Sequence, residues 1–255
     1  MARRLLGKDL YRAACYWVDG LLIDSGISHR RMDLATSLSG YPVSAIVNTH
    51  AHEDHMGANA LLQSARRVPV FGHTKALPTI EDPRKLSLLP YQRLFFGEPS
   101  PAIGTPVDET IATRCHTFRV LHAPGHSPDH IVLHEADRGW LFAGDAFIAG
   151  QDRVFRGCYD IREMTATLRM LASLGAEIMF TGMGNVVRRP AKQIERKLDH
   201  FEEISQRIGM LRREGLKAAE IARRLFPRDL AVRLVTSGDF SAEHLVRSVL
   251  RGAES

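Results

Sequence analysis

The chain has 255 residues, of which 44% are hydrophobic and 25% charged, as in an ordinary soluble globular protein. No apolar run approaches the roughly 20 residues that cross a bilayer, which excludes a membrane-spanning helix. The charged residues Lys8, Asp9 and Arg12 interrupt the region where a signal peptide needs an apolar core. The three cysteines are far apart and form no disulfide framework, so we expect a cytoplasmic protein without a membrane partner.

The formal net charge of +5 is concentrated near the C-terminus. Residues 185–255 hold 15 Lys+Arg and 10 Asp+Glu, whereas the rest of the chain holds 19 of each. We interpret this excess as the solvated surface of helices. The alternative is a basic patch that attracts an anionic substrate or RNA.

Short apolar runs predict strands in the first part of the chain, over residues 14–19, 21–24, 43–48 and 68–71. Gly20 separates the first two, which predicts a hairpin, and residues 58–65 have the pattern of a helix. Residues 74–113 carry six prolines and little periodicity. We expect this segment to be irregular and to cover part of the mouth of an active site.

Strands and a helix also follow one another in the second part of the chain, and the last part is predicted to be helical. Strands are predicted over residues 118–122, 130–134, 140–143 and 177–181, and a helix over 161–174. From Arg189 onward apolar residues recur every three or four positions, and shorter helices are expected over 218–225, 230–236 and 241–251. Short strands with helices between them indicate an α/β (α+β) fold of packed sheets flanked by helices.

Four side chains that commonly bind metals fall within six residues, directly after a predicted strand: His50, His52, Asp54 and His55. Imidazole is a good ligand for zinc or iron, and a carboxylate suits a second, harder position. In an extended turn His50 and His52 point the same way, because the strand period is two. Asp54 and His55 can then point at a second ion beside the first.

Two further candidate ligands follow later strands. His126 projects from a Pro-Gly turn, and Asp145 follows Gly144 at the end of an apolar run. An aspartate placed there can bridge two cations. Together with the first cluster, and in this order at strand ends, these residues predict a metal site.

These motifs resemble the metallo-β-lactamase superfamily of hydrolases, in particular its glyoxalase II-like and lactonase-like members. Residues 50–55 match its HxHxDH motif, His126 its third histidine and Asp145 its bridging aspartate. The resemblance covers roughly residues 13–187. It implies a four-layer αββα sandwich, with a catalytic domain over residues 1–187 and a helical, winged-helix-like tail over 188–255. It also implies that His50, His52 and His126 bind one metal, while Asp54 and His55 serve a second.

One position departs from the family pattern. Similar proteins carry a last histidine in Gly-His-Gly, and this chain has Gly182-Met183-Gly184. A thioether is a poor ligand for Zn²⁺. We therefore expect one or two Zn²⁺ ions with a weakened second site, and Fe²⁺ is the alternative metal.

A divalent ion at such a site lowers the pKa of bound water from ~15.7 to about 7, so that hydroxide is available as a nucleophile. Asp54 is the candidate catalytic residue that orients this hydroxide and transfers its proton. Further candidates for supporting the ligands or contacting substrate are Asp24, His73, Asp129 and His130. Each of these four also has a purely structural interpretation.

The leading hypothesis is a hydrolase (EC 3) that acts on a small ester, thioester or lactone, including an anionic one. A second is a mononuclear iron enzyme resembling persulfide dioxygenases, with His50, His126 and Asp145 as ligands. A third is an RNA nuclease that uses the basic residues 215–227, where the aromatic residues that stack on bases are scarce. A fourth is a degenerate, structural metal site. An exposed apolar side on the C-terminal helices would allow a homodimer.

Overall fold

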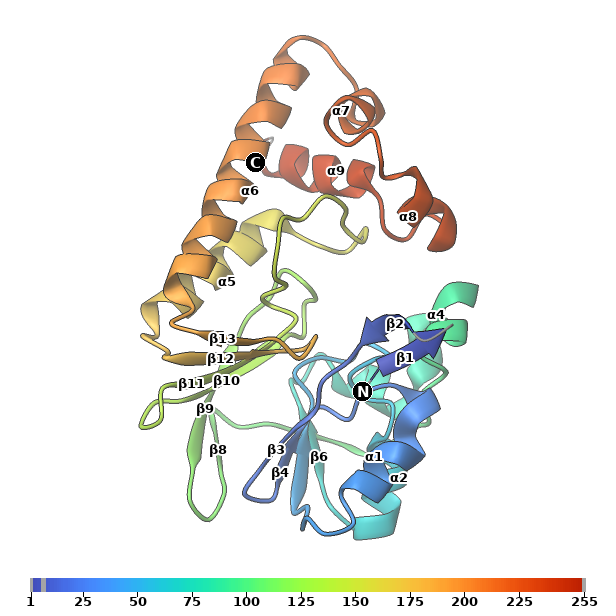
Figure 1. Cartoon of the computed structure of the whole chain (residues 1–255), viewed down its shortest axis with the longest axis vertical. Helices are drawn as coiled ribbons and strands as arrows, with labels where there is room; N and C mark the ends of the chain where they lie inside the picture. The colour runs from blue at the N-terminus through green and yellow to red at the C-terminus, as the bar shows by residue number, and fades with distance from the viewer. Residues whose placement is uncertain (1, 6–7, 254–255) are drawn as a thin grey trace.

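The computed structural model describes residues 2–5 and 8–253 (Figure 1). Met1 and residues 6–7, at the N-terminus where we expect no signal peptide, lie outside the described residues, as do residues 254–255 of the expected tail. Within the described residues, no helix combines the length and the apolar character needed to cross a membrane.

The first sheet has five strands in the order β3 (Tyr16–Val18), β4 (Leu21–Ile23), β5 (Ala45–Val47), β6 (Val70–Gly72) and β7 (Gly104–Pro106). β3 and β4 are antiparallel, as the predicted hairpin requires, and the other neighbours are parallel. Three helices cover its outer face: α1 (Arg31–Ser37), which the sequence did not predict, α2 (Asn59–Arg66) and α3 (Leu77–Glu81).

The second sheet has six strands in the spatial order β13-β12-β11-β10-β9-β8. Along the chain they are β8 (Thr110–Ala112), β9 (Thr117–His122), β10 (Ile131–Glu135), β11 (Trp140–Gly144), β12 (Ile178–Thr181) and β13 (Val186–Arg188). Only β11 and β12 run parallel, and α5 (Ile161–Ser173) makes the crossover that a parallel pair needs. A separate hairpin of β1 (Ala2–Leu5) and β2 (Lys8–Arg12) precedes both sheets.

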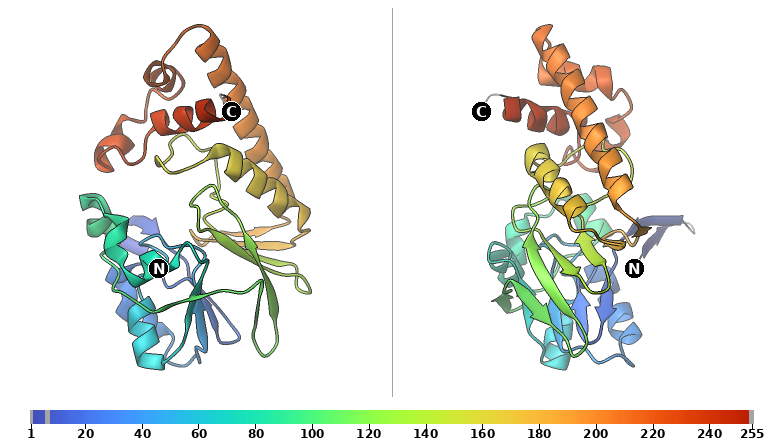
Figure 2. Two further views of the ribbon diagram at one scale, coloured as in Figure 1. Left: turned by 180° about the vertical axis from the view of Figure 1, so that it is seen from behind. Right: turned by 90° about the vertical axis from the view of Figure 1, so that its left-hand side faces the viewer.

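Alternating side chains build the layers on either side of each sheet. Leu21 and Ile23 of β4 pack between the sheets against Phe142 of β11, whereas Leu22 faces the helices on the first sheet. The Phe142 ring stacks on Phe180 at 4.7 Å with an interplanar angle of 13°. The two views of Figure 2 show helices outside both sheets, which confirms the predicted four-layer αββα sandwich.

Four helices form the described part of the C-terminal extension: α6 (Ala191–Arg213), α7 (Ala218–Leu225), α8 (Leu230–Val235) and α9 (Ala242–Ala253). Phe201 of α6, Ile221 of α7 and Leu245 of α9 share one core with Leu168 of α5 on the second sheet. An isolated bridge between Phe155 and Ser241 also ties this extension to the catalytic part. The division between residues 187 and 188 stays a prediction.

The prediction that residues 74–113 are irregular was wrong. The segment contains α3, a 3-10 helix over Pro83–Leu86, α4 (Pro90–Phe95), β7 and β8. Three of its six prolines, Pro78, Pro83 and Pro90, lie in the first turns of helices, where a missing N–H costs nothing. A high proline content is therefore compatible with regular helices and strands in this segment.

Replacing Phe142 should test whether the packing between the sheets holds the fold together. Phe142 is 2% exposed, so Phe142→Ala should lower the free energy of unfolding by about 3–5 kcal/mol. Val186→Ala, at a side chain that is 57% exposed, is the control and should change it by less than about 0.5 kcal/mol. Urea unfolding followed by circular dichroism measures both, and equal effects would contradict this core assignment.

Candidate metal centre

The predicted ligands lie at the carboxyl ends of strands from both sheets. Residues 50–55 follow β5, His126 follows β9 and Asp145 follows β11. The structure brings all of them together in the interior, with His52 half-buried and the others buried. Short connections after the strands therefore place side chains from distant parts of the chain at one edge of the sandwich.

The first group of ligand atoms consists of three imidazole nitrogens. His52 Nδ1 lies 2.9 Å from His50 Nε2 and 3.0 Å from His126 Nε2. The ligand atoms of these three residues all lie within 4.8 Å of one another. A shared cation satisfies three converging nitrogen lone pairs, and imidazole is a normal ligand for zinc, so the arrangement fits a metal ion.

The second group combines His50 and His55 with Asp145, again within 4.8 Å of one another. His55 Nε2 lies 3.5 Å from an Asp54 oxygen and 3.7 Å from Asp145 Oδ2, which is also 3.7 Å from His126 Nε2. His55 Nε2 and Asp145 Oδ1 are buried without a hydrogen-bond partner among the described residues. Buried polar atoms are normally paired, so these atoms fit the ligands of a cation.

Burial sets the protonation of the first group. It lowers the pKa of His50 and His52 well below the usual range, and neighbouring imidazoles add to this. Burial also lowers the pKa of His126 to about 3. These rings are neutral at physiological pH and keep a lone pair for a metal.

The pKa of His55 shifts in the opposite direction. Burial lowers its pKa, but the carboxylates of Asp24, Asp54 and Asp145 outweigh burial and raise it well above its ordinary value. The second group is therefore rich in negative charge, as a cation site should be.

Asp24 orients both groups through one buried carboxylate. It accepts hydrogen bonds from the Thr49 backbone N–H at 2.7 Å, the Thr49 hydroxyl at 2.9 Å and His55 Nδ1 at 2.8 Å. Thr49 Oγ1 lies 3.1 Å from His50 Nδ1 and accepts the proton of that nitrogen, because the hydroxyl proton is already donated to Asp24. With Nδ1 donating in both rings, Nε2 of His50 and Nε2 of His55 face the cluster. The neutral His50 ring keeps a lone pair there, whereas His55 would give up its Nε2 proton to bind a cation.

Two other predicted supporting residues contact the ligands. Asp129 Oδ2 accepts the backbone N–H of Ala51 at 2.8 Å, between His50 and His52. His130 stacks on His50 at 4.7 Å, and its Nε2 accepts the Asp145 backbone N–H at 3.1 Å. Both side chains thus hold the backbone that carries the cluster.

The fourth candidate, His73, lies elsewhere. Its ring stacks on His122 at 4.6 Å with an interplanar angle of 13°. It does not line the cavity beside the cluster. The structure does not bring His73 to the ligands.

Two glycines allow the backbone to approach the cluster closely. A Cβ atom on Gly144, whose φ is +49°, would lie 2.8 Å from Thr49 Oγ1. A Cβ atom on Gly182 would clash with Asp145 Oδ1. The Gly-Asp and Gly-Met turns therefore need glycine for steric reasons.

A cavity of about 350 Å³ opens beside the cluster. His52, Asp54, His126 and Asp145 line it from the cluster side. Met183 lines the same cavity, where the family pattern places its last histidine. Phe96 also lines it, so the segment 74–113 covers part of the mouth as expected.

An arginine that the sequence did not suggest also lines this cavity. Arg156 donates to Glu53 at 3.1 Å and to the Tyr91 hydroxyl at 3.0 Å, and its Nε lies 3.0 Å from Asp239. These contacts join the HxHxDH loop, α4 and the C-terminal extension. The sequence offers one signal of this network, which is the position of Glu53 inside the HxHxDH motif. Arg156 itself lies in no recognisable pattern.

Residues 10–183 match the metallo-β-lactamase superfamily. The chain belongs to this superfamily. The shared part includes the HxHxDH motif, His126 and Asp145, and it ends at Met183.

Two curated relatives and one solved structure are similar to the chain. It is 31% identical over 175 residues to "Beta-lactamase-like protein 2 homolog" of Drosophila melanogaster, covering 65% of this chain and 53% of the relative. It is 38% identical over 141 residues to hydroxyacylglutathione hydrolase of Halorhodospira halophila, covering 53% and 44%. The chain thus spans about half the length of these relatives.

The solved structure is a metallo-β-lactamase family protein of Thermus thermophilus. It superimposes with a TM-score of 0.70 at 21% identity and covers 94% of this chain and 88% of its own. At this identity the likeness concerns the fold alone. It extends through the C-terminal helices, since so much of both chains is covered.

Met183 provides a test of the second metal position. Met183→His should raise the affinity for a second Zn²⁺ by at least about tenfold, because imidazole binds Zn²⁺ far better than a thioether. Calorimetric titration of the metal-free protein measures this, and Met183→Leu is the control that should leave it unchanged. Equal affinities in all three proteins would contradict the placement of Met183.

The Asp24 carboxylate should matter for metal affinity although it touches no ion. Asp24→Asn removes the charge that orients His55, so the affinity of the second site should fall about 10–100-fold. Asp33→Asn, at an exposed side chain of α1, is the matched control. An unchanged titration of the Asp24 variant would mean that His55 is positioned by packing alone.

Proposed function

We propose that this metallo-hydrolase cleaves acyl thioesters, and related small esters and lactones, at the cluster. The observation that carries the proposal is the pair of adjoining ligand groups that open onto one cavity. The name of the relative hydroxyacylglutathione hydrolase, whose substrate is an acyl thioester, supports the choice of thioesters.

In this proposal His50, His52 and His126 would hold a first Zn²⁺ ion, Asp54 and His55 would serve a second, and Asp145 would contribute its carboxylate to the cluster. A bound divalent ion supplies an acidified water and polarises the acyl carbonyl. Fe²⁺ is the alternative metal for the same ligands. The buried positions of these side chains favour a dry, preorganised site.

The protein's own groups would manage the protons of the reaction. Asp54 lines the cavity and lies 3.5 Å from His55 Nε2, where its carboxylate can accept a proton from the attacking water. A C–O bond forms, the C–S bond breaks, and the same proton can pass to the departing thiolate. The products are a carboxylic acid and a thiol.

Tyr159 is the candidate donor to the developing oxyanion. It lines the cavity, and its ring lies 4.6 Å from that of His126. A phenol hydroxyl aimed at the carbonyl oxygen would stabilise the transition state more than the substrate.

Replacing Asp54 tests the hydrolase proposal. Asp54→Asn should lower kcat for an acyl N-acetylcysteamine thioester by about 10²–10⁴-fold, because proton transfer is lost. Asp137→Asn, at an exposed residue, is the control. Chelation should abolish the wild-type activity, and Zn²⁺ should restore it. Thioester, ester and lactone panels that remain uncleaved by the metal-loaded protein would overturn the proposal.

Tyr159→Phe separates oxyanion stabilisation from binding. It should lower kcat about 10²-fold with little change in KM, since the hydroxyl acts mainly in the transition state. Tyr41→Phe, at a side chain that is 52% exposed, should leave both constants unchanged. A Tyr159 variant with wild-type kcat would remove this residue from the mechanism.

A further inference from the structure

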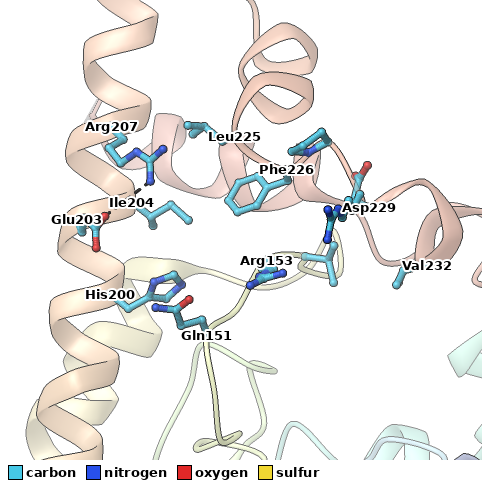
Figure 3. Close-up of a pocket in the computed structure, with 13 residues that line it drawn as sticks. Gln151, Arg153, His200, Glu203, Ile204, Arg207, Leu225, Phe226, Asp229 and Val232 are labelled. Carbon is cyan, nitrogen blue, oxygen red and sulfur yellow. Dashed lines mark ion pairs between the residues drawn. The ribbon is translucent and has the colours of Figure 1, made fainter.

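A second and larger cavity lies next to the cavity of the metal cluster. Its volume is about 660 Å³, and it is enclosed by the loop over residues 151–154, by α6 and by the connection between α7 and α8 (Figure 3). This volume is within the range of ordinary ligand sites. Nothing in the proposed chemistry at the cluster requires such a space.

The two cavities adjoin. Gln151, Arg153 and Val154 line both of them, so one short stretch of chain forms their common wall. A ligand with an acyl group at the cluster can therefore continue past this stretch toward α6. Such a ligand must be long, because the cluster cavity already has room for a small acyl group.

Arginines dominate the charge of the second cavity. Arg153, Arg207 and Arg228 line it, and within the described part of the chain Arg153 and Arg228 have no ion-pair partner. Figure 3 shows Arg153 and Arg207 pointing toward the same space. Guanidinium groups bind phosphate and carboxylate in a bidentate manner, which fits a ligand with several anionic groups.

The acidic residues of the cavity are already engaged. Glu203 pairs with Arg207 at 3.7 Å on an exposed surface, where such a pair is weak. Asp229 accepts the backbone N–H of Ala242 at 3.1 Å, at the start of α9. Neither carboxylate cancels the charge of Arg153 or Arg228.

The cavity also has an aromatic and apolar side. Phe226 lies at the end of α7 and its ring faces the same space, with Ile204 and Leu225 nearby (Figure 3). An aromatic ring beside arginines suits a heteroaromatic base that carries phosphates. A tripeptide thiol has no such base, and its ammonium group would meet the arginines.

We propose that this second cavity binds the nucleotide part of a coenzyme A-type thioester, whose acyl group reaches the metal cluster. This inference rests on the proposed thioester hydrolysis for the acyl end only. The basic excess of residues 185–255 then serves, in part, to bind an anionic substrate.

Binding of free coenzyme A, which needs no turnover, tests the inference. In calorimetric titrations with the metal-loaded full chain, Arg207→Gln and Arg228→Gln should each raise the Kd about tenfold, because each loses charge-assisted hydrogen bonds to phosphate. Arg223→Gln is the matched control, since Arg223 is an exposed arginine of α7 that does not line the cavity.

A kinetic ratio adds a second readout. The kcat/KM for an acyl-coenzyme A, relative to that for the same acyl N-acetylcysteamine thioester, should fall about tenfold in Arg207→Gln. Cleavage of the short thioester without measurable binding of coenzyme A would overturn this inference and leave the hydrolase proposal standing. Arginine-dependent binding of coenzyme A without cleavage of any thioester would overturn the hydrolase proposal alone. Arginine-dependent binding of glutathione or single-stranded RNA in place of coenzyme A would also overturn the inference.

Discussion

The buried carboxylate of Asp24 is the interaction on which the site depends. It accepts three hydrogen bonds, from the backbone and hydroxyl of Thr49 and from His55, and so connects β4 to the HxHxDH loop. Asp24 has a φ of +58°, a backbone conformation that residues other than glycine adopt only at some cost in energy. The surrounding sheet maintains this conformation, because the Asp24 backbone N–H bonds to Val47 of β5 at 2.9 Å. The fold therefore fixes the positions of Thr49 and His55 at the cluster.

The metal cluster was predictable from the sequence because its ligands are local or follow recognisable turns. The strands β3 to β6 and β9 to β12 were predictable for the same reason, since each is a short apolar run beside turn residues. The other described strands were not predicted: β7 and β8 lie in segment 74–113, and β1, β2 and β13 include arginines that interrupt the apolar pattern. Segment 74–113 was not predictable, because proline can begin a helix as well as interrupt an extended chain. Arg156 and Tyr159 were also missed, since they reach the cavity from a connection that carries no motif. Their roles depend on long-range packing, which local patterns do not encode.

The C-terminal extension borders both the cluster cavity and the second cavity. Asp239 contacts Arg156 beside the cluster, and Phe240 lines the same cavity. α6 and the end of α7 line the second cavity, which shares a wall with the first. In a fold that hosts many chemistries, substrate choice depends on such added elements more than on the metal ligands. The common core of α5, α6, α7 and α9 holds this surface against the second sheet.

The two ligand groups share His50, and we propose that they hold metal in the native protein. The most direct test is the metal content per chain, by plasma mass spectrometry, of wild type and His50→Gln purified without added metal. We expect one or two ions of zinc or iron per wild-type chain and almost none in the variant. A folded wild-type protein without stoichiometric metal, or a variant that keeps its full metal content, would contradict it.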